Sequence, residues 1–342
     1  MAALGYKLLE LLSRRDYQLF QQMRGLSNYY LSCCVNTLLQ TLSATWELTD
    51  LLERWDAAGE RADDCNVPLQ LRRVLVTMRG DLPQPAPHRD FLHCLDRNRI
   101  RLNVQHDADE VFLSILNFVQ QQMGNKNLAL EIHNLYKISV ETHLRCLECS
   151  SIQTRKSHML SLPLHIREDD NTLEDCVKSF FEDQDLRGIN NCFCKGCGKK
   201  MPSRQGIKLC ALPDILCIHL KRFRNSRGFI RKLNSRVTFP ENFDPSEILK
   251  EAFSTDFAQS GCTYTLYAVV VHCGSAESGH YTAYVRDRAD KCWYYADDSH
   301  VQKASWGQVQ TIFGGPNSRG TAYMLMYRRH LTQEGQQAEL SG

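Results

Sequence analysis

The chain has 342 residues, of which 43% are hydrophobic and 23% charged, and its 41 basic and 39 acidic residues give a formal net charge of +2. This balance is typical of a globular protein and argues against a nucleic-acid-binding protein, which would carry a basic surplus. The apolar stretches are too short to span a bilayer, and the length predicts one large domain with sub-domains or two domains.

The N-terminal residues 1–22 predict a short amphipathic helix, because Lys7, Glu10 and Arg14 lie among its leucines. A signal peptide would instead carry an uninterrupted apolar core. The chain also contains fifteen cysteines, an odd number. Without a signal peptide a disulfide framework is not expected. We therefore expect reduced thiols, some of them catalytic or metal-bound, and a cytoplasmic or partly nuclear location.

The first third of the chain predicts helices. Apolar residues recur at close to helical spacing from Cys33 to Trp55, and again over Asp107–Met123. Between these helices, residues 61–87 are more polar and contain four prolines, which predicts a connector with short helices.

After about Tyr136 the pattern changes to strands, interrupted by a helix over Thr172–Phe181. The start of that helix resembles a capping box with Asp175 in place of glutamate. Strands are predicted at 137–146, 152–166, 207–210, 215–222, 264–271, 280–286, 293–295 and 321–328. Helices followed by mostly antiparallel strands predict an α+β fold, and residues 333–342 predict a polar tail.

Cys33 is the first candidate nucleophile, because a turn over residues 25–32 runs into the first helix there. A thiol at a helix N-terminus meets the positive end of the helix dipole, which favours the thiolate. Free N–H groups at that end could hold an oxyanion, Asn28 could add a side-chain donor, and Ser32 is a candidate N-cap. Cys34 follows directly, and spacing alone does not choose between the two cysteines. A lone cysteine at a helix start is also more often a small buried residue.

A base and an orienting carboxylate occur together near the end of the chain. His280 begins a predicted strand after a flexible loop, and Gly279 leaves room for a partner chain to approach its ring. Asp297 and Asp298 end the next strand, so a hairpin would bring a histidine and an aspartate side by side. Each group alone has an ordinary structural interpretation, and their joint occurrence in the order Cys, His, Asp favours catalysis.

Two C-x-x-C pairs suggest a metal site: Cys146 with Cys149, and Cys194 with Cys197. Four thiolates suit tetrahedral zinc. The 44 residues between the pairs exceed the usual zinc-ribbon spacing, but the tips of two adjacent hairpins could still meet. Structural zinc is favoured over vestigial pairs or redox thiols, and Cys192 is an alternative ligand to Cys194.

These residues lie in segments that resemble the ubiquitin-specific protease family. Residues 25–40 are similar to its cysteine box, and residues 104–107 with Glu110 to its glutamine-aspartate box. Residues 212–223 resemble a palm strand, and residues 264–298 resemble the histidine box. The resemblance follows the family order over nearly the whole chain.

The resemblance implies a papain-like cysteine protease core with thumb, palm and zinc-tipped fingers. The catalytic domain would cover residues 23–332, with the thumb over about 23–130, the fingers inserted at about 137–235 and the palm in the remainder. By position the family roles are nucleophile for Cys33, general base for His280, orienting residue for Asp297 with support from Asp298, and oxyanion donor for Asn28. Substrate contacts would come from Gln105, Asp107, Gly279 and Tyr281, with Asp107 meeting an arginine of the modifier tail. No cofactor is implied for catalysis.

Within the family, Cys34, residues 191–200 and residues 321–323 are similar to the interferon-induced member that removes a two-domain, interferon-stimulated modifier. That similarity implies this modifier and its conjugates as partners, and a negative role in interferon responses. It also implies a second, non-enzymatic role at the type I interferon receptor complex.

Three positions depart from the family pattern: Tyr30 replaces a glycine, Cys34 a tyrosine and Ala296 an aromatic residue. None removes a catalytic group, so activity is expected. The rival functions are an ordinary ubiquitin isopeptidase, a scaffold of this fold that binds a modifier or receptor without cutting, and a zinc-ribbon nucleic-acid binder. The near-neutral charge argues against the last of these.

Overall fold

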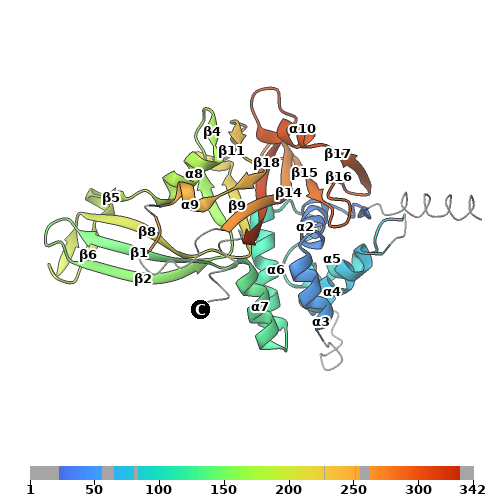
Figure 1. The fold of residues 1–342 in the computed structure, drawn as a ribbon, viewed down its shortest axis with the longest axis horizontal. Helices are drawn as coiled ribbons and strands as arrows, with labels where there is room; N and C mark the ends of the chain where they lie inside the picture. The colour runs from blue at the N-terminus through green and yellow to red at the C-terminus, as the bar shows by residue number, and fades with distance from the viewer. Residues whose placement is uncertain are drawn as a thin grey trace, which may run out of the picture. The chain divides into compact units, whose positions relative to one another are not determined.

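The computed structural model describes residues 23–55, 65–80, 84–226, 228–250, 252–254 and 262–331 (Figure 1). The chain divides into two compact units. The first comprises Met1–Ala129, Val270–Cys273 and Ser278–Val309, and the second Leu130–Val269, Gly274–Glu277 and Gln310–Gly342. The expected N-terminal helix and polar tail lie outside the described residues. Among the residues described, no helix is both long and apolar enough to cross a bilayer.

The first unit is built around a buried helix. Its helices are α2 (Cys33–Ser43), α3 (Trp46–Arg54), α4 (Val67–Met78), α5 (Arg89–Arg97) and α6 (Ala108–Gln122). Every residue of α2 from its start to Leu42 is buried, and α2 packs against α3, α4, α6 and two strands of the same unit. The first residue of this central helix is the candidate nucleophile.

The helix predicted from Cys33 to Trp55 is in fact two helices, so that prediction was wrong in its continuity. The chain leaves helical geometry at Thr45, whose ψ is 80°. The hydroxyls of Thr41 and Thr45 donate to backbone carbonyls three and four residues earlier, at 2.8 Å each, and such bonds weaken a helix. The apolar spacing continues across this break, which is why the periodicity did not reveal it.

The structure also tests the helix predicted over residues 107–123 and the short helices predicted in the polar connector. The helix expected over 107–123 is confirmed as α6. The polar connector contains a longer helix than expected, the twelve-residue α4. Asn66 caps α4 by accepting from the Leu69 N–H at 2.9 Å, and Pro68 lies in the first turn, where its missing N–H costs nothing.

Three antiparallel strands carry the histidine and aspartates: β15 (Gly279–Arg286), β16 (Trp293–Asp297) and β17 (His300–Ala304). Ala283 pairs with Ala296, so β15 and β16 form the predicted hairpin. Their sequence neighbour β14 (Cys262–Gly274) runs from the second unit into the first.

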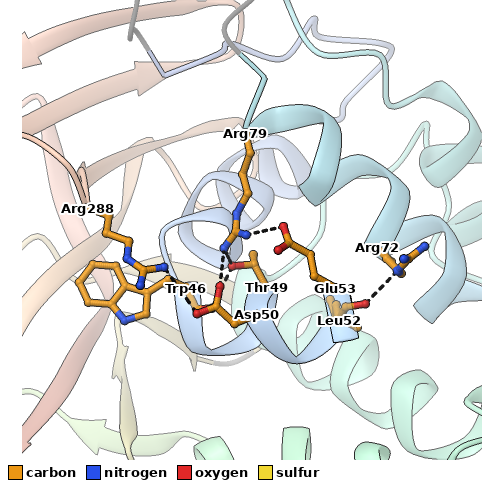
Figure 2. Close-up of polar contacts among 8 residues, drawn as sticks. All are labelled: Trp46, Thr49, Asp50, Leu52, Glu53, Arg72, Arg79 and Arg288. Carbon is orange, nitrogen blue, oxygen red and sulfur yellow. Dashed lines mark hydrogen bonds and ion pairs between the residues drawn. The ribbon is translucent and has the colours of Figure 1, made fainter. Parts of the chain in front are cut away.

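An arginine cluster anchors the turn of this hairpin to α3 (Figure 2). The Arg288 guanidinium lies over the Trp46 ring, 5.0 Å from its centroid, and its Nη1 lies 3.5 Å from Asp50 Oδ2. Asp50 also pairs with Arg79 at 3.1 Å, and Arg79 contacts Thr49 and Glu53 as well. Exposed ion pairs contribute little stability one by one, but this shared network fixes the position of the turn.

The second unit contains a four-stranded antiparallel sheet in the order β2-β1-β8-β5. Its strands are β1 (Ile138–Cys146), β2 (Ile152–Met159), β8 (Ser203–Ala211) and β5 (Gln184–Leu186), and the hairpin of β6 (Cys192–Cys194) and β7 (Lys199–Met201) lies at one end of it in Figure 1. The same unit contains α8 (Leu173–Phe181), whose N-cap Thr172 accepts from the Asp175 N–H at 3.1 Å, which confirms the predicted cap.

A buried group of strands forms the rest of the second unit. It contains β3 (Leu162–His165), β9 (Ile215–Lys221), β18 (Gly320–Leu331) and β13 (Asn242–Phe243), together with the first part of β14. β9 pairs antiparallel with β18 and parallel with β3. Smaller elements of this unit are α9 (Pro245–Ile248), β4 (Asn171–Thr172), β10 (Phe223–Ser226), β11 (Phe229–Lys232), β12 (Val237–Thr238) and the 3₁₀ turns Gly188–Asn190 and Thr311–Phe313. The residues of α7 (Lys126–Tyr136) are divided between the units, and α10 (Trp306–Gln310) belongs to the first unit up to Val309. The predicted α+β class is confirmed.

Arg222, which follows β9, is fully buried, and its guanidinium is satisfied by backbone carbonyls. It donates to Ala322 at 2.6 Å, to Leu233 and Ser235 at 2.9 Å each, and to Phe313 at 3.4 Å. Burial lowers its pKa to about 10, so the cation is retained at neutral pH. One side chain thus binds four carbonyls from three backbone segments of the second unit.

We expect Arg222→Leu to destabilise the protein by about 3 kcal/mol or more, because each buried carbonyl left without a donor costs about 1–3 kcal/mol. The urea midpoint followed by circular dichroism measures this. Arg145→Leu, which changes an exposed arginine of the same unit, should stay within about 0.5 kcal/mol of wild type. Equal urea midpoints for the two variants would contradict this stabilising role of Arg222.

Candidate active site

The structure distinguishes the two adjacent cysteines. Cys33 is the first residue of α2, as expected, and its interaction with His280 is the largest influence on the pKa of that imidazole. Cys34 is 2% exposed, and burial raises the pKa of its thiol well above the usual range. Cys34 therefore stays a protonated, inert thiol, and the geometry favours Cys33 as the reactive one.

His280 bridges the thiol and a carboxylate. Its Nε2 lies 2.7 Å from Asp297 Oδ1, which leaves Nδ1 for Cys33. The pKa of His280 is raised to about 9. The interaction with Cys33 is the largest cause, burial opposes it, and the hydrogen bond to Asp297 raises the pKa further. At neutral pH the ring therefore carries a proton that it can donate to a leaving group.

This raised pKa predicts a pH dependence of stability. A group whose pKa rises on folding contributes stability that is complete below its unfolded value, here 6.5, and is lost as the pH passes through the folded value of about 9. We expect wild type to lose stability relative to His280→Ala between pH 6.5 and 9. Urea unfolding at four pH values in that range measures the difference, and a constant difference would contradict the ion pair.

Asp298 follows Asp297 in the chain and accepts hydrogen bonds from two asparagine amides. Its Oδ1 accepts from Asn36 Nδ2 and its Oδ2 from Asn28 Nδ2, both at 2.8 Å. Its φ of 50° is left-handed and turns the side chain away from the strand direction. The bond to Asp298 orients the nitrogen of the Asn28 amide, which the sequence marked as an oxyanion donor, and the Asn28 oxygen accepts from the N–H and hydroxyl of Ser32 at 3.3 Å each. Sequence reasoning gave Asn36 no role, although it lies in the same segment.

The loop before α2 packs closely on the hairpin that carries the aspartates. A Cβ on Gly25 would lie 2.3 Å from the Ser299 carbonyl oxygen, so only glycine fits there. The Leu26 N–H donates to the Asp298 carbonyl at 2.9 Å. Tyr30 is 73% exposed, and its φ of 63° lies in the left-handed region. The glycine of the family pattern would be less strained there than tyrosine.

The prediction of Ser32 as a side-chain cap was wrong. Ser32 precedes α2, but its Oγ accepts from the Tyr29 N–H at 2.9 Å and makes no cap bond. The first-turn N–H groups of α2 thus lack a side-chain cap. This leaves them available to an oxyanion formed on a carbonyl attached to Cys33.

The four expected substrate-contacting residues lie in the same unit, with different environments. The Gln105 amide holds the backbone of Gly279, with Nε2 donating to its carbonyl at 3.1 Å and Oε1 accepting from its N–H at 3.4 Å. Asp107 caps α6 by accepting from the Asp109 N–H at 2.9 Å. Tyr281 is 5% exposed, so its ring supports the site from the interior.

Gly279 is explained by a neighbour that the sequence did not indicate. A Cβ there would lie 2.0 Å from His272 Nε2. The space beside Gly279 is therefore filled by an imidazole of this chain, which corrects the expectation that it stays open for a partner. The glycine allows β14 and β15 to approach.

His280, Asp297 and Asp298 also satisfy a purely geometric criterion for a metal site, because their ligand atoms lie within 4.8 Å of one another. The hydrogen bonds argue against that use. Asp297 Oδ1 already binds the imidazole, and both Asp298 oxygens accept from amides. The set is better suited to orienting a base than to holding a cation.

A second cluster lies in the second unit, where the two C-x-x-C pairs meet. The sulfurs of Cys146, Cys149, Cys194 and Cys197 lie within 4.8 Å of one another. Cys146 and Cys197 are 4.0 Å apart, and Cys149 and Cys194 are 3.5 Å apart. Tetrahedral coordination with Zn–S bonds of about 2.3 Å requires sulfurs about 3.8 Å apart, so this donor set fits a zinc ion. Cys192, the alternative ligand, instead contacts the Asn190 carbonyl.

Comparison with known proteins agrees with this geometry. The family model described as "Ubiquitin carboxyl-terminal hydrolase" matches residues 24–327. The chain is 35% identical to human "Ubl carboxyl-terminal hydrolase 18" over 315 residues, which cover 89% of this chain and 84% of that protein. The mouse protein of the same name is also 35% identical. "Ubiquitin carboxyl-terminal hydrolase 47" of Drosophila melanogaster is 26% identical, over 25% of its own length.

Proposed function

Because the chain belongs to the ubiquitin carboxyl-terminal hydrolase family, we propose that it is an isopeptidase that cuts a ubiquitin-like modifier from target lysines, with the interferon-stimulated modifier preferred. The enzyme class itself, a thiol-dependent hydrolase of the deubiquitinase type, follows from the family and from the relatives at 35% identity. The single observation that carries the proposal is the row formed by Cys33, His280 and Asp297 in one unit.

In the proposed reaction the Cys33 sulfur attacks the carbonyl carbon of the modifier's terminal glycine. A C–S bond forms, and the carbonyl oxygen becomes an oxyanion held by Asn28 and the uncapped N–H groups of α2. His280, which already carries a proton, passes it to the lysine nitrogen as the C–N bond breaks. A water then attacks the thioester and gives its proton to His280. The C–S bond then breaks, which regenerates the thiolate and releases the terminal carboxyl group of the modifier, whose remaining proton passes to solvent as the group ionises.

The remaining residues orient these groups. Asp297 holds the imidazole by its Nε2, and Gln105 holds the backbone at Gly279, one residue before the base. Loss of one oxyanion donor typically costs about 10²–10³ in rate. We assign Asp107 to the substrate side by its match to the family pattern, whereas the buried Tyr281 ring supports the site from the interior.

The architecture proposed is thumb, palm and fingers, with the first-unit helices as the thumb and zinc at the tip of the fingers. The zinc proposal is supported by the spacing of the four sulfurs. Bound there, the ion would hold the ends of the β1–β2 and β6–β7 hairpins together through Cys146, Cys149, Cys194 and Cys197.

The preference for the interferon-stimulated modifier is supported by the relatives whose printed name is Ubl carboxyl-terminal hydrolase 18. We extend the proposal to a negative role in interferon responses, a contact with the type I interferon receptor complex and a cytoplasmic and nuclear location. All three rest on family resemblance alone.

The test is release of a fluorophore from the C-terminus of ubiquitin and of the interferon-stimulated modifier, with wild type and Cys33→Ala. We expect release from the interferon-stimulated modifier that is lost in the variant, with slower release from ubiquitin. Equal rates would keep the isopeptidase and overturn the preference. Binding of either modifier without release would favour the non-cutting scaffold.

A further inference from the structure

We propose that His88 is a positioning residue for the oxyanion donor Asn28, acting through Asn36 and Asp298; the inference rests on the proposed isopeptidase reaction. His88 precedes α5 and lies between the cysteine box and the glutamine-aspartate box, outside both motifs. Its imidazole Nε2 lies 2.7 Å from Asn36 Oδ1. With the two 2.8 Å bonds of Asp298, this contact completes an unbroken path from His88 to Asn28.

The path runs from the interior to the reaction surface. His88 is 1% exposed and Asn36 2% exposed, Asp298 is half-buried, and Asn28 is exposed. An exposed amide has many orientations available, whereas a buried one is fixed by its partners. The buried end of the path can therefore hold the exposed end in one orientation.

The hydrogen bonds determine which way each group points. The Asn36 amide nitrogen faces the Asp298 carboxylate and also the Ser27 carbonyl at 3.3 Å, both of which only accept. The Asn36 oxygen must then face His88 Nε2 at 2.7 Å, whereas His88 Nδ1 faces the Ala86 carbonyl at 3.3 Å. Both partners only accept, and the shorter contact places the single hydrogen of a neutral ring on Nε2. Burial, the largest effect, lowers the pKa of His88, which agrees with a neutral ring that donates from one nitrogen.

Removing this donor would leave a buried oxygen unpaired on Asn36. The Asn36 side chain would then rotate or shift to reach another donor, and its hydrogen bond to Asp298 would weaken. Asp298 would in turn no longer fix the nitrogen of the Asn28 amide, which would then be held only by the longer 3.3 Å contacts of its oxygen with Ser32. Small misplacements of a catalytic group cost up to about 100-fold in rate, so an effect of roughly 10-fold to 100-fold on kcat is expected, with KM little changed.

A double-mutant cycle on modifier–fluorophore hydrolysis tests this positioning role. The variants are His88→Leu, Asn28→Ala and the double variant, with His88→Gln as the conservative change and His93→Leu, an exposed histidine of α5, as the matched control. We expect His88→Leu to lower kcat roughly 10-fold or more, yet to add nothing once Asn28 is alanine. His88→Gln, whose amide can donate, should restore part of the rate, and His93→Leu should match wild type. Equal effects of His88→Leu with and without Asn28 would overturn the proposal.

A readout that needs no turnover separates this proposal from the proposed function. We expect nuclear magnetic resonance of the wild type to show His88 protonated on Nε2 and one Asn28 side-chain proton protected from exchange. That protection should be lost in His88→Leu and kept in His93→Leu. If wild type cleaves neither modifier, the isopeptidase fails while this measurement still decides the path. Unchanged Asn28 protection in a folded His88→Leu overturns it.

Discussion

Cys33→Ala is expected to lower kcat/KM for modifier release by roughly 10⁴-fold or more, because no other group can form the acyl intermediate. Cys34→Ala, one residue further along α2, is expected to keep the rate within a few-fold. The difference follows from their environments: the Cys33 sulfur interacts with His280, whereas burial raises the pKa of the Cys34 thiol and keeps it protonated. Initial rates with a modifier–fluorophore substrate measure both variants.

Binding and labelling provide the controls for this pair. Cys33→Ala should bind the modifier at least as tightly as wild type, because the substitution removes no binding surface beyond one sulfur. Iodoacetamide at neutral pH should modify Cys33 well before Cys34, which fragmentation of the shared peptide resolves. Loss of activity in Cys34→Ala with Cys33→Ala unaffected would move the nucleophile to Cys34 and contradict the assignment.

The sequence predicted the local parts of this site because each depends on near neighbours. Cys33 was placed at a helix start by the apolar spacing that follows it, and the structure begins α2 at that residue. His280 and Asp297 were brought together by one hairpin with a short turn, which strand alternation reveals. The two C-x-x-C pairs were expected to meet despite 44 intervening residues, and the sulfurs do so.

The parts that were missed depend on contacts distant in sequence. His88 and Asn36 are 52 residues apart, and Asn36 and Asp298 are 262 apart, so no local pattern connects them. The ring that fills the space beside Gly279 comes from the preceding strand, through the close approach of two backbones. Ser32 had the right residue type for a cap, but the Tyr29 N–H of the tight loop competes for its oxygen.

Purified protein is expected to contain one zinc ion per chain, and Cys194→Ser is expected to lose it. Zinc sites of this type bind with apparent free energies of about 10–16 kcal/mol at neutral pH, most of which requires all four thiolates. Because the ion would tie together the ends of the β1–β2 and β6–β7 hairpins, we expect their amides to exchange faster by at least about tenfold in the variant. Elemental analysis and hydrogen exchange measure the two effects.

Cys192→Ser is the matched control, since it changes a cysteine two residues away whose sulfur contacts the Asn190 carbonyl outside the cluster. It should keep the zinc and the slow exchange. The reaction of Cys33 with iodoacetamide should stay within about twofold in both variants, because the four metal ligands and the catalytic row belong to different units. Modifier hydrolysis should fall only in Cys194→Ser if the zinc-bound hairpins contribute to modifier binding. Zinc retained in Cys194→Ser, or lost in Cys192→Ser, would contradict the ligand set and return Cys192 to consideration.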